Sequence, residues 1–193
     1  GKRAIRLCFV EKELFLTQLR AALRASAYGP LQIMFPMVGS LEDIRKAKEY
    51  LNLAKEQLKE RKQQFDEQIR IGIMIEIPAI ALIADLAAEE VDFASIGSND
   101  LTQYLSAADR MNPEVAAYYK SDSTAMLRLL GFVFREFSKR EKEISVCGEM
   151  AGNPETAQLL VGLGARKLSM SSGNIAGVKA KLAECTLQEL TAL

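Results

Sequence analysis

The chain has 193 residues, of which 49% are hydrophobic and 26% are charged, values typical of a soluble globular domain. Lys and Arg together number 25, as do Asp and Glu, so the formal net charge is zero. This balance argues against a nucleic-acid-binding protein, whose binding surface carries an excess of basic residues. No apolar stretch reaches the ~20 residues of a membrane-spanning helix. The mixed charges near the start are also unlike a signal peptide, so we expect no membrane insertion.

The cysteine and histidine counts restrict the chemistry further. The three cysteines, Cys8, Cys147 and Cys185, are odd in number and far apart, which argues against a disulfide framework and predicts a cytoplasmic location. The absence of histidine excludes a Ser–His or Cys–His catalytic pair, the usual zinc sites and a phosphohistidine carried by this chain. Acid–base or metal chemistry must therefore use carboxylates, cysteine, lysine or tyrosine.

Short apolar runs predict the β-strands. Several of them are nearly continuous in apolar residues, as in strands that are buried on both faces. The predicted strands are residues 31–37, 69–76, 91–96, 144–147 and 167–170, and a sixth is expected at residues 3–7.

Amphipathic segments between these runs predict helices at residues 11–26, 40–62, 79–89, 124–139, 153–162 and 175–182. We find no linker or low-complexity tract, so residues 1–193 are expected to form a single domain. Regular alternation of strand and helix with right-handed crossovers gives either a doubly wound sheet or an eight-stranded barrel.

Polar side chains follow three of the predicted strands. Glu76 ends one strand, Asn99 and Asp100 follow the next, and Cys147 ends a third. Functional groups at several successive strand ends favour the barrel, but a full barrel takes roughly 250 residues and only five or six strands fit here. We therefore expect an α/β domain of the (β/α)8 TIM-barrel type that lacks its first two or three βα units.

Residues 95–110 are the most informative segment. An apolar run ends at a glycine turn, which is followed by Asn99 and Asp100 at an expected helix start and by Arg110 ten residues after Asp100. A metal-binding carboxylate beside an anion-binding arginine indicates a phosphorylated substrate, although an N-capping Asn-Asp pair would give the same pattern. In the same way, Glu76 could be a salt-bridged carboxylate at a barrel rim, and Cys147 could simply fill space.

Taken together, the motifs resemble the phosphoenolpyruvate-binding domain of Enzyme I, the phosphoenolpyruvate–protein phosphotransferase family of the bacterial sugar phosphotransferase system. The related pyruvate phosphate dikinases and phosphoenolpyruvate synthases share the segment at residues 97–103, but residues 147–152 (Cys-Gly-Glu-Met-Ala-Gly) are more similar to Enzyme I. The collinear matches are residues 3–6, 18–21, 33–37, 72–79, 95–104, 109–110, 147–152 and 169–171.

The resemblance implies a role for each site residue. Glu76 and Asp100 match the Mg2+ ligands, and Asn99 matches a substrate-binding residue. Arg110 matches an arginine that holds the phosphate or carboxylate of phosphoenolpyruvate. Arg3 matches another substrate-binding arginine of the active site, although by position alone it could be a surface charge near the terminus. Cys147 matches the general acid that protonates C3 of the enolate as pyruvate forms.

The implied reaction is phosphoryl transfer from phosphoenolpyruvate to a histidine on an N-terminal domain and then to a small phosphocarrier protein. Further arginines of the phosphate clamp are expected before residue 1, so the parent protein is expected to be the enzyme and this chain alone to be inactive. The family dimerises through this domain, so a homodimer is also implied. Two alternatives remain at this point: a catalytically silent dimerisation or interaction fragment, and a relative of the dikinases and synthases.

Overall fold

The computed structural model describes residues 1–192, and within them five parallel strands form one sheet in the order β1-β2-β3-β4-β5. Each strand lies beside its neighbour in the sequence, with helical segments between them, as expected for one part of a (β/α) barrel. Five of the six predicted strands are confirmed, with small differences in their bounds. The strands are β1 (Gln32–Phe35), β2 (Arg70–Ile75), β3 (Phe93–Gly97), β4 (Glu143–Cys147) and β5 (Leu168–Ser169).

The helices connect these strands and extend beyond β5. Their bounds are α1 (Ala4–Cys8), α2 (Lys12–Ala25), α3 (Leu41–Glu60), α4 (Pro78–Leu82), α5 (Ala84–Glu90), α6 (Ser98–Ser106), the 3-10 helix η1 (Pro113–Tyr118), α7 (Thr124–Lys139), α8 (Glu149–Gly152), α9 (Pro154–Gly162), α10 (Ser172–Ala183) and α11 (Leu187–Thr191). None of the helices within residues 1–192 combines the length and apolar character needed to span a bilayer.

Two sequence predictions need correction. The strand expected at residues 3–7 is wrong, because this segment forms α1, whose backbone is hydrogen-bonded locally while Ile5 is buried in the core. The single helix expected at residues 79–89 is divided into α4 and α5, because the backbone of Ile83 leaves helical geometry (φ −116°, ψ 34°).

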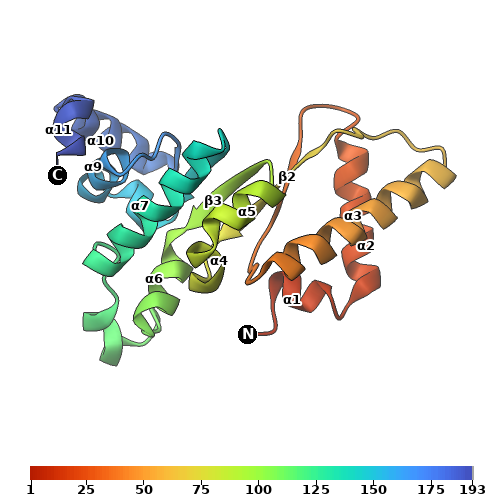
Figure 1. Cartoon of the computed structure of the whole chain (residues 1–193), viewed down its shortest axis with the longest axis horizontal. Helices are drawn as coiled ribbons and strands as arrows, with labels where there is room; N and C mark the ends of the chain where they lie inside the picture. The colour runs from red at the N-terminus through yellow and green to blue at the C-terminus, as the bar shows by residue number, and fades with distance from the viewer. Residues whose placement is uncertain (193) are drawn as a thin grey trace.

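Alternate residues along each strand point to opposite faces of the sheet. Ile73 and Ile75 of β2, Ile96 of β3 and Val146 of β4 are buried in the main apolar cluster. Helices α3, α5 and α7 cover that face and lie side by side across it (Figure 1). The opposite face borders a hollow of about 520 Å3, whose lining includes Met34, Met74, Ser95 and Cys147. The helix-covered face therefore supplies the core, and the other face corresponds to the inside of an incomplete barrel.

We expect Ile73→Ala to lower the free energy of unfolding by about 2–5 kcal/mol, because it leaves a cavity between β2 and the helices. Urea unfolding followed by circular dichroism measures this loss. Leu53→Ala is the control: Leu53 is exposed on α3, so its truncation should change stability by no more than about 0.5 kcal/mol. Equal losses in the two variants would contradict the assigned core.

Candidate active site at the carboxyl ends of the strands

Three neighbouring strands bring most of the sequence-predicted site residues to one edge of the sheet. Glu76 directly follows β2, Asn99 and Asp100 lie in the first turn of α6 directly after β3, and Cys147 is the last residue of β4. The register pairs Ile75 with Ile96, and Gly97 with Cys147, so these strand ends lie in a row. Parallel strands thus gather groups that are up to 71 residues apart in the chain, from position 76 to position 147.

Glu76 is a buried carboxylate, with only 7% of its surface exposed. Its Oε1 accepts a hydrogen bond of 2.6 Å from the backbone N–H of Met37. Burial raises the pKa of Glu76, and the charge of Asp100 raises it further, while the Met37 N–H and the charge of Arg3 act in the opposite direction. Met37 itself has a left-handed backbone (φ 59°), which is uncommon for a non-glycine residue and accompanies the approach of its N–H to the carboxylate.

The ionised partner of Asp100 is Arg3. The distance between Arg3 Nη2 and Asp100 Oδ1 is 2.5 Å, and the two side chains are 52% and 19% exposed. The same nitrogen lies 3.4 Å from the Tyr104 hydroxyl and 3.5 Å from Met37 Sδ. Hydrogen bonding to Asp100 raises the pKa of Arg3, which therefore stays charged. Arg3 thus joins the segment before α1 to the strand-end carboxylates.

Asn99 has a structural role that differs from helix capping. The N-cap of α6 is Gly97, with no side-chain capping bond, so the N-capping interpretation of the Asn-Asp pair is wrong. Asn99 Oδ1 instead accepts a hydrogen bond of 3.0 Å from the backbone N–H of Glu149, after β4. Its backbone carbonyl accepts a 3.1 Å hydrogen bond from the Tyr119 hydroxyl. Asn99 therefore connects the ends of β3 and β4.

Cys147 is a protonated thiol among these groups. Its Sγ donates to the carbonyl of Ile96 at 3.4 Å and lies 3.8 Å from Met74 Sδ. Burial raises the pKa of Cys147, and the nearby charges of Glu76 and Asp100 raise it further. A thiol that holds its proton is suited to act as an acid, whereas a nucleophilic cysteine has a lowered pKa.

Gly148 makes the turn from β4 into α8. Its φ is +101°, and a Cβ atom there would lie 2.5 Å from Ser98 Oγ and 2.8 Å from Asn99 Oδ1. Ser98 Oγ also donates a 2.7 Å hydrogen bond to the Cys147 carbonyl. Glycine is thus required both by the backbone conformation and by the close approach of the two strand ends.

Arg110 lies at the edge of this group. It is exposed in the loop between α6 and η1, and its backbone N–H donates a 3.1 Å hydrogen bond to Gln103 Oε1. Among the described residues, no hydrogen bond or ion pair joins its guanidinium to Glu76 or Asp100. Its charge instead acts on Tyr119, whose hydroxyl contacts Asn99. Arg110 is therefore not joined to the strand-end carboxylates by any contact within residues 1–192.

Tyr104 and Tyr119 are site neighbours that sequence reasoning missed. Tyr104 could have been found, because it lies four residues after Asp100 on the same helix and so shares its face. Tyr119 reaches Asn99 from a loop twenty residues away, and no periodic pattern signals such a contact.

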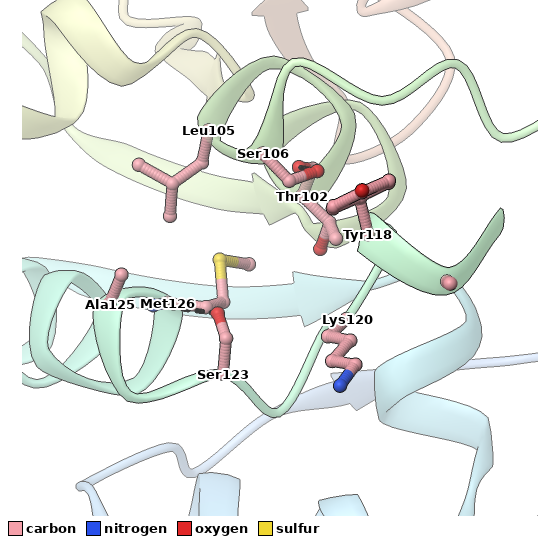
Figure 2. Close-up of a pocket in the computed structure, with 9 residues that line it drawn as sticks. Thr102, Leu105, Ser106, Tyr118, Lys120, Ser123, Ala125 and Met126 are labelled. Carbon is pink, nitrogen blue, oxygen red and sulfur yellow. Dashed lines mark hydrogen bonds between the residues drawn. The ribbon is translucent and has the colours of Figure 1, made fainter. Parts of the chain in front are cut away.

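A second hollow lies on another side of α6. It has a volume of about 330 Å3, and its lining contains neither a carboxylate nor an arginine. Figure 2 shows Thr102, Leu105 and Ser106 of α6 on one side of it and Ser123, Ala125 and Met126 on the other. The charged strand-end groups are elsewhere, so we place the candidate active site at the strand ends.

The carboxylates of Glu76 and Asp100 fit Mg2+ if the substrate completes its coordination. Within residues 1–192, no group of three or more acidic, cysteine or histidine side chains is placed to hold a metal by itself. Glu76 and Asp100 supply two carboxylates whose charges interact. Because Mg2+ commonly binds one or two carboxylates and completes its coordination with substrate oxygens and water, this pair suits Mg2+ in the presence of an anionic substrate.

Comparison with known proteins identifies the family. The family model described as "PEP-utilising enzyme, PEP-binding domain" matches residues 1–187, so the chain belongs to this family of phosphoenolpyruvate-binding domains. The chain is 47% identical over 189 residues to a phosphoenolpyruvate-protein phosphotransferase of Bacillus subtilis (strain 168), which covers 98% of this chain and 33% of the relative. Identity is 50% over 175 residues to the protein of that name from Listeria monocytogenes, covering 91% and 31%. The chain thus spans about a third of the length of these curated relatives.

Solved structures support the barrel-type fold. A citrate lyase from Burkholderia xenovorans LB400 superimposes with a TM-score of 0.64 at 17% identity, covering 92% of this chain and 58% of the other. A malate synthase from Haloferax volcanii gives a TM-score of 0.62 at 17% identity, covering 89% and 50%. At such low identity these similarities show the fold alone. They confirm the predicted α/β fold of the TIM-barrel type, present here as part of a barrel.

We expect Gly148→Ala to lower the free energy of unfolding by about 1–3 kcal/mol, because alanine is strained at this φ and meets Ser98 and Asn99. The matched control is Gly173→Ala in α10, where an added Cβ meets no atom within 4 Å. There the same substitution should stabilise the protein by up to roughly 1 kcal/mol. Thermal and urea unfolding of both variants test this, and a change of the same sign in both would contradict it.

We expect Glu76→Gln to stabilise the ligand-free protein at pH 7. A carboxyl group with a raised pKa in the folded state contributes stability while protonated, and this contribution is lost as the pH rises through the raised pKa. Glutamine keeps an acceptor for the Met37 N–H and has no charge to bury. The stability difference between variant and wild type should therefore grow from pH 4.5 to pH 7.5 in urea unfolding. The control is Glu60→Gln, at an exposed position at the end of α3, which should show no such trend. A pH-independent difference for Glu76→Gln would contradict the buried charge.

Proposed function

We propose that this chain carries the phosphoenolpyruvate and Mg2+ site of a phosphoenolpyruvate–protein phosphotransferase of the Enzyme I kind. The observation that carries the proposal is the meeting of Glu76, Asp100 and Cys147 at neighbouring strand ends, in a chain of the phosphoenolpyruvate-binding family. The names of the relatives support the same activity. The chain has no histidine, so the phosphoryl acceptor is a histidine elsewhere in the parent protein.

Phosphoenolpyruvate has a phosphate and a carboxylate, and the site offers permanent positive charge for both. Arg3 pairs with Asp100 directly, and the charge of Arg110 acts on Tyr119, whose hydroxyl contacts Asn99. Both guanidinium groups stay charged and can bind an oxyanion through two parallel hydrogen bonds. Glu76 and Asp100 would hold Mg2+, which would neutralise the negative charge on the phosphoryl oxygens.

Substrate binding requires an exchange of partners at Asp100. In the ligand-free protein, Asp100 Oδ1 is held by Arg3, so this oxygen is free for a metal only after the guanidinium moves away. The incoming substrate provides anionic oxygens that can take over Arg3. Because half of the Arg3 surface is exposed, the movement displaces no buried side chain.

Cys147 supplies the proton that completes the reaction. As the bond between phosphorus and the bridging oxygen breaks, the phosphoryl group passes to the acceptor histidine and the electron pair stays on the enolate. The enolate carbon C3 then takes a proton from Cys147 Sγ, which gives pyruvate and a thiolate that regains its proton from solvent. The raised pKa of Cys147 keeps the proton on sulfur until it is needed.

The partners follow from this activity. They are phosphoenolpyruvate, the domain with the acceptor histidine, and the small phosphocarrier protein of the sugar phosphotransferase system, in the cytoplasm. The names of the relatives favour the phosphotransferases over the dikinase and synthase branch.

We expect the folded chain to bind phosphoenolpyruvate in the presence of Mg2+ in titration calorimetry. Arg110→Ala and Asp100→Asn should each weaken binding by about 10- to 100-fold, because each removes a charge that contacts the anion or its metal. Arg61→Ala, at the exposed end of α3, controls for loss of positive charge alone and should bind as wild type does. Absence of binding to the folded wild-type chain would contradict a site carried by this chain.

We infer self-association as a second function from one apolar surface. Leu82 and Leu86 are 66% and 44% exposed, and a groove of about 510 Å3 lies next to them. Its lining is mainly apolar: Pro78, Leu82, Leu105, Ala125, Arg128, Leu129 and Phe132. Apolar surface of this kind is typical of interaction sites, and a second copy of the chain is the partner that gives a homodimer.

We expect Leu82→Glu to weaken this homodimer by at least about 10-fold in its dissociation constant, because it places a charge in the apolar contact. Sedimentation velocity over a range of protein concentrations measures the change. Leu53→Glu is the control, since Leu53 is similarly exposed on α3 away from this groove. A wild-type chain that stays monomeric at all concentrations would refute the dimer.

A further inference from the structure

Two sulfur atoms meet on the inner face of the sheet, although their strands are not neighbours. Met74 is on β2 and Cys147 ends β4, and β3 lies between these two strands. Both side chains border the hollow on the inner face, and the distance between Met74 Sδ and Cys147 Sγ is 3.8 Å. Because neighbouring strands lie roughly 4.8 Å apart, the two side chains must reach toward each other across β3 to make this contact.

The contact is possible because β3 has a glycine at this point. Gly97 pairs with Cys147 in the register of β3 and β4. A Cβ atom at Gly97 would lie 3.1 Å from Met74 Sδ and 2.9 Å from Glu76 Cβ, and both distances are shorter than a normal contact. The φ of Gly97 is −83°, so a left-handed backbone does not explain the glycine. The space it leaves is occupied by the side chains of Met74 and Glu76.

The thiol of Cys147 is contacted on two sides. Its Sγ lies 3.4 Å from the backbone carbonyl oxygen of Ile96 and 3.8 Å from Met74 Sδ, and either atom can accept the thiol proton. A cysteine side chain has three staggered rotamers, and contacts on two sides select one of them. Since a thiol is a weak donor and a thioether a weak acceptor, the contacts orient the thiol without holding its proton strongly.

We propose that Met74 is a positioning residue for Cys147, which it reaches through the space left at Gly97. The proposal rests on the proposed function, in which the thiol gives a proton to C3 of the enolate. The acid must lie within hydrogen-bond reach of the atom that it protonates. A thiol held in one rotamer is ready for this transfer, so loss of the Met74 sulfur lowers the rate of proton transfer and leaves substrate affinity unchanged.

The first test uses the ligand-free chain with carbon-13 in the methionine methyl groups. Cys147→Ala should shift the methyl NMR resonance of Met74, because the neighbouring sulfur is lost. The resonance of Met34, which borders the same hollow from β1, is the control and should stay unchanged. An unshifted Met74 resonance would overturn the contact and, with it, the proposal.

The second test is the exchange of the C3 protons of pyruvate with D2O, catalysed by this chain in the presence of Mg2+. In this partial reaction the Cys147 thiolate takes a proton from C3, and the electron pair of the broken C–H bond forms the enolate. The thiol exchanges its proton with solvent and returns a deuteron to C3, so no phosphoryl acceptor is needed. Proton NMR of the pyruvate methyl group measures the rate, and Cys147→Ala should abolish the exchange.

Met74→Leu removes the sulfur and keeps an apolar side chain of similar volume. It should lower the maximal exchange rate by about 3- to 10-fold and change the pyruvate concentration for half-maximal rate by less than about 2-fold. Met34→Leu makes the same substitution on β1 and should leave both values as in the wild type. A wild-type rate in Met74→Leu, or an equal loss in the two variants, would overturn the positioning role.

The two tests separate this proposal from the proposed function. A wild-type chain that exchanges no C3 protons contradicts the proposed role of Cys147, while the methyl resonance of Met74 still decides whether the two sulfur atoms are in contact. Normal exchange that does not depend on Met74 supports the function and overturns the positioning role.

Discussion

The rest of the site depends on one constraint, which is that the carboxylate of Glu76 is buried. A carboxylate that has lost its water is unstable as an anion unless donors or positive charges replace that water. The Met37 N–H provides one such donor at 2.6 Å, and Arg3 provides a charge nearby. The negative charge of Asp100 raises the pKa of Glu76, which shows that the two carboxylates repel each other. A cation bound between them would relieve this repulsion. Arg3 partly meets this demand in the ligand-free protein, through its ion pair with Asp100.

The parallel sheet explains why these groups meet. The strands end at the same edge, where β2 is followed at once by Glu76, β3 by α6 with Asn99 and Asp100, and β4 ends in Cys147. Two glycines allow the close approach: a Cβ at Gly97 would lie 2.9 Å from Glu76 Cβ, and one at Gly148 would meet Ser98 and Asn99. The same architecture leaves the inner face of the sheet open, because five strands form only part of a barrel.

Sequence reasoning recovered the strand order and most of the helices because periodic burial leaves a pattern in the chain. It failed at residues 3–7, where a few apolar residues suit a strand or a helix equally well, and at Ile83, where a local backbone change divides one helix into two. The grouping of Glu76, Asp100 and Cys147 was predictable, since all three lie at or shortly after the carboxyl end of a strand. Contacts such as those of Tyr119 with Asn99 and of Met37 with Glu76 depend on tertiary geometry, which no local pattern encodes. The catalytic and binding roles of the site residues stay predictions.

A crystal of this chain soaked with phosphoenolpyruvate and Mn2+, a substitute for Mg2+ with an anomalous X-ray signal, provides the most direct test. We predict an anomalous peak between the carboxylates of Glu76 and Asp100, with the Arg3 guanidinium moved from Asp100 to an oxygen of the substrate. A metal bound elsewhere, or substrate bound with the ion pair between Arg3 and Asp100 intact, would contradict this account of the site.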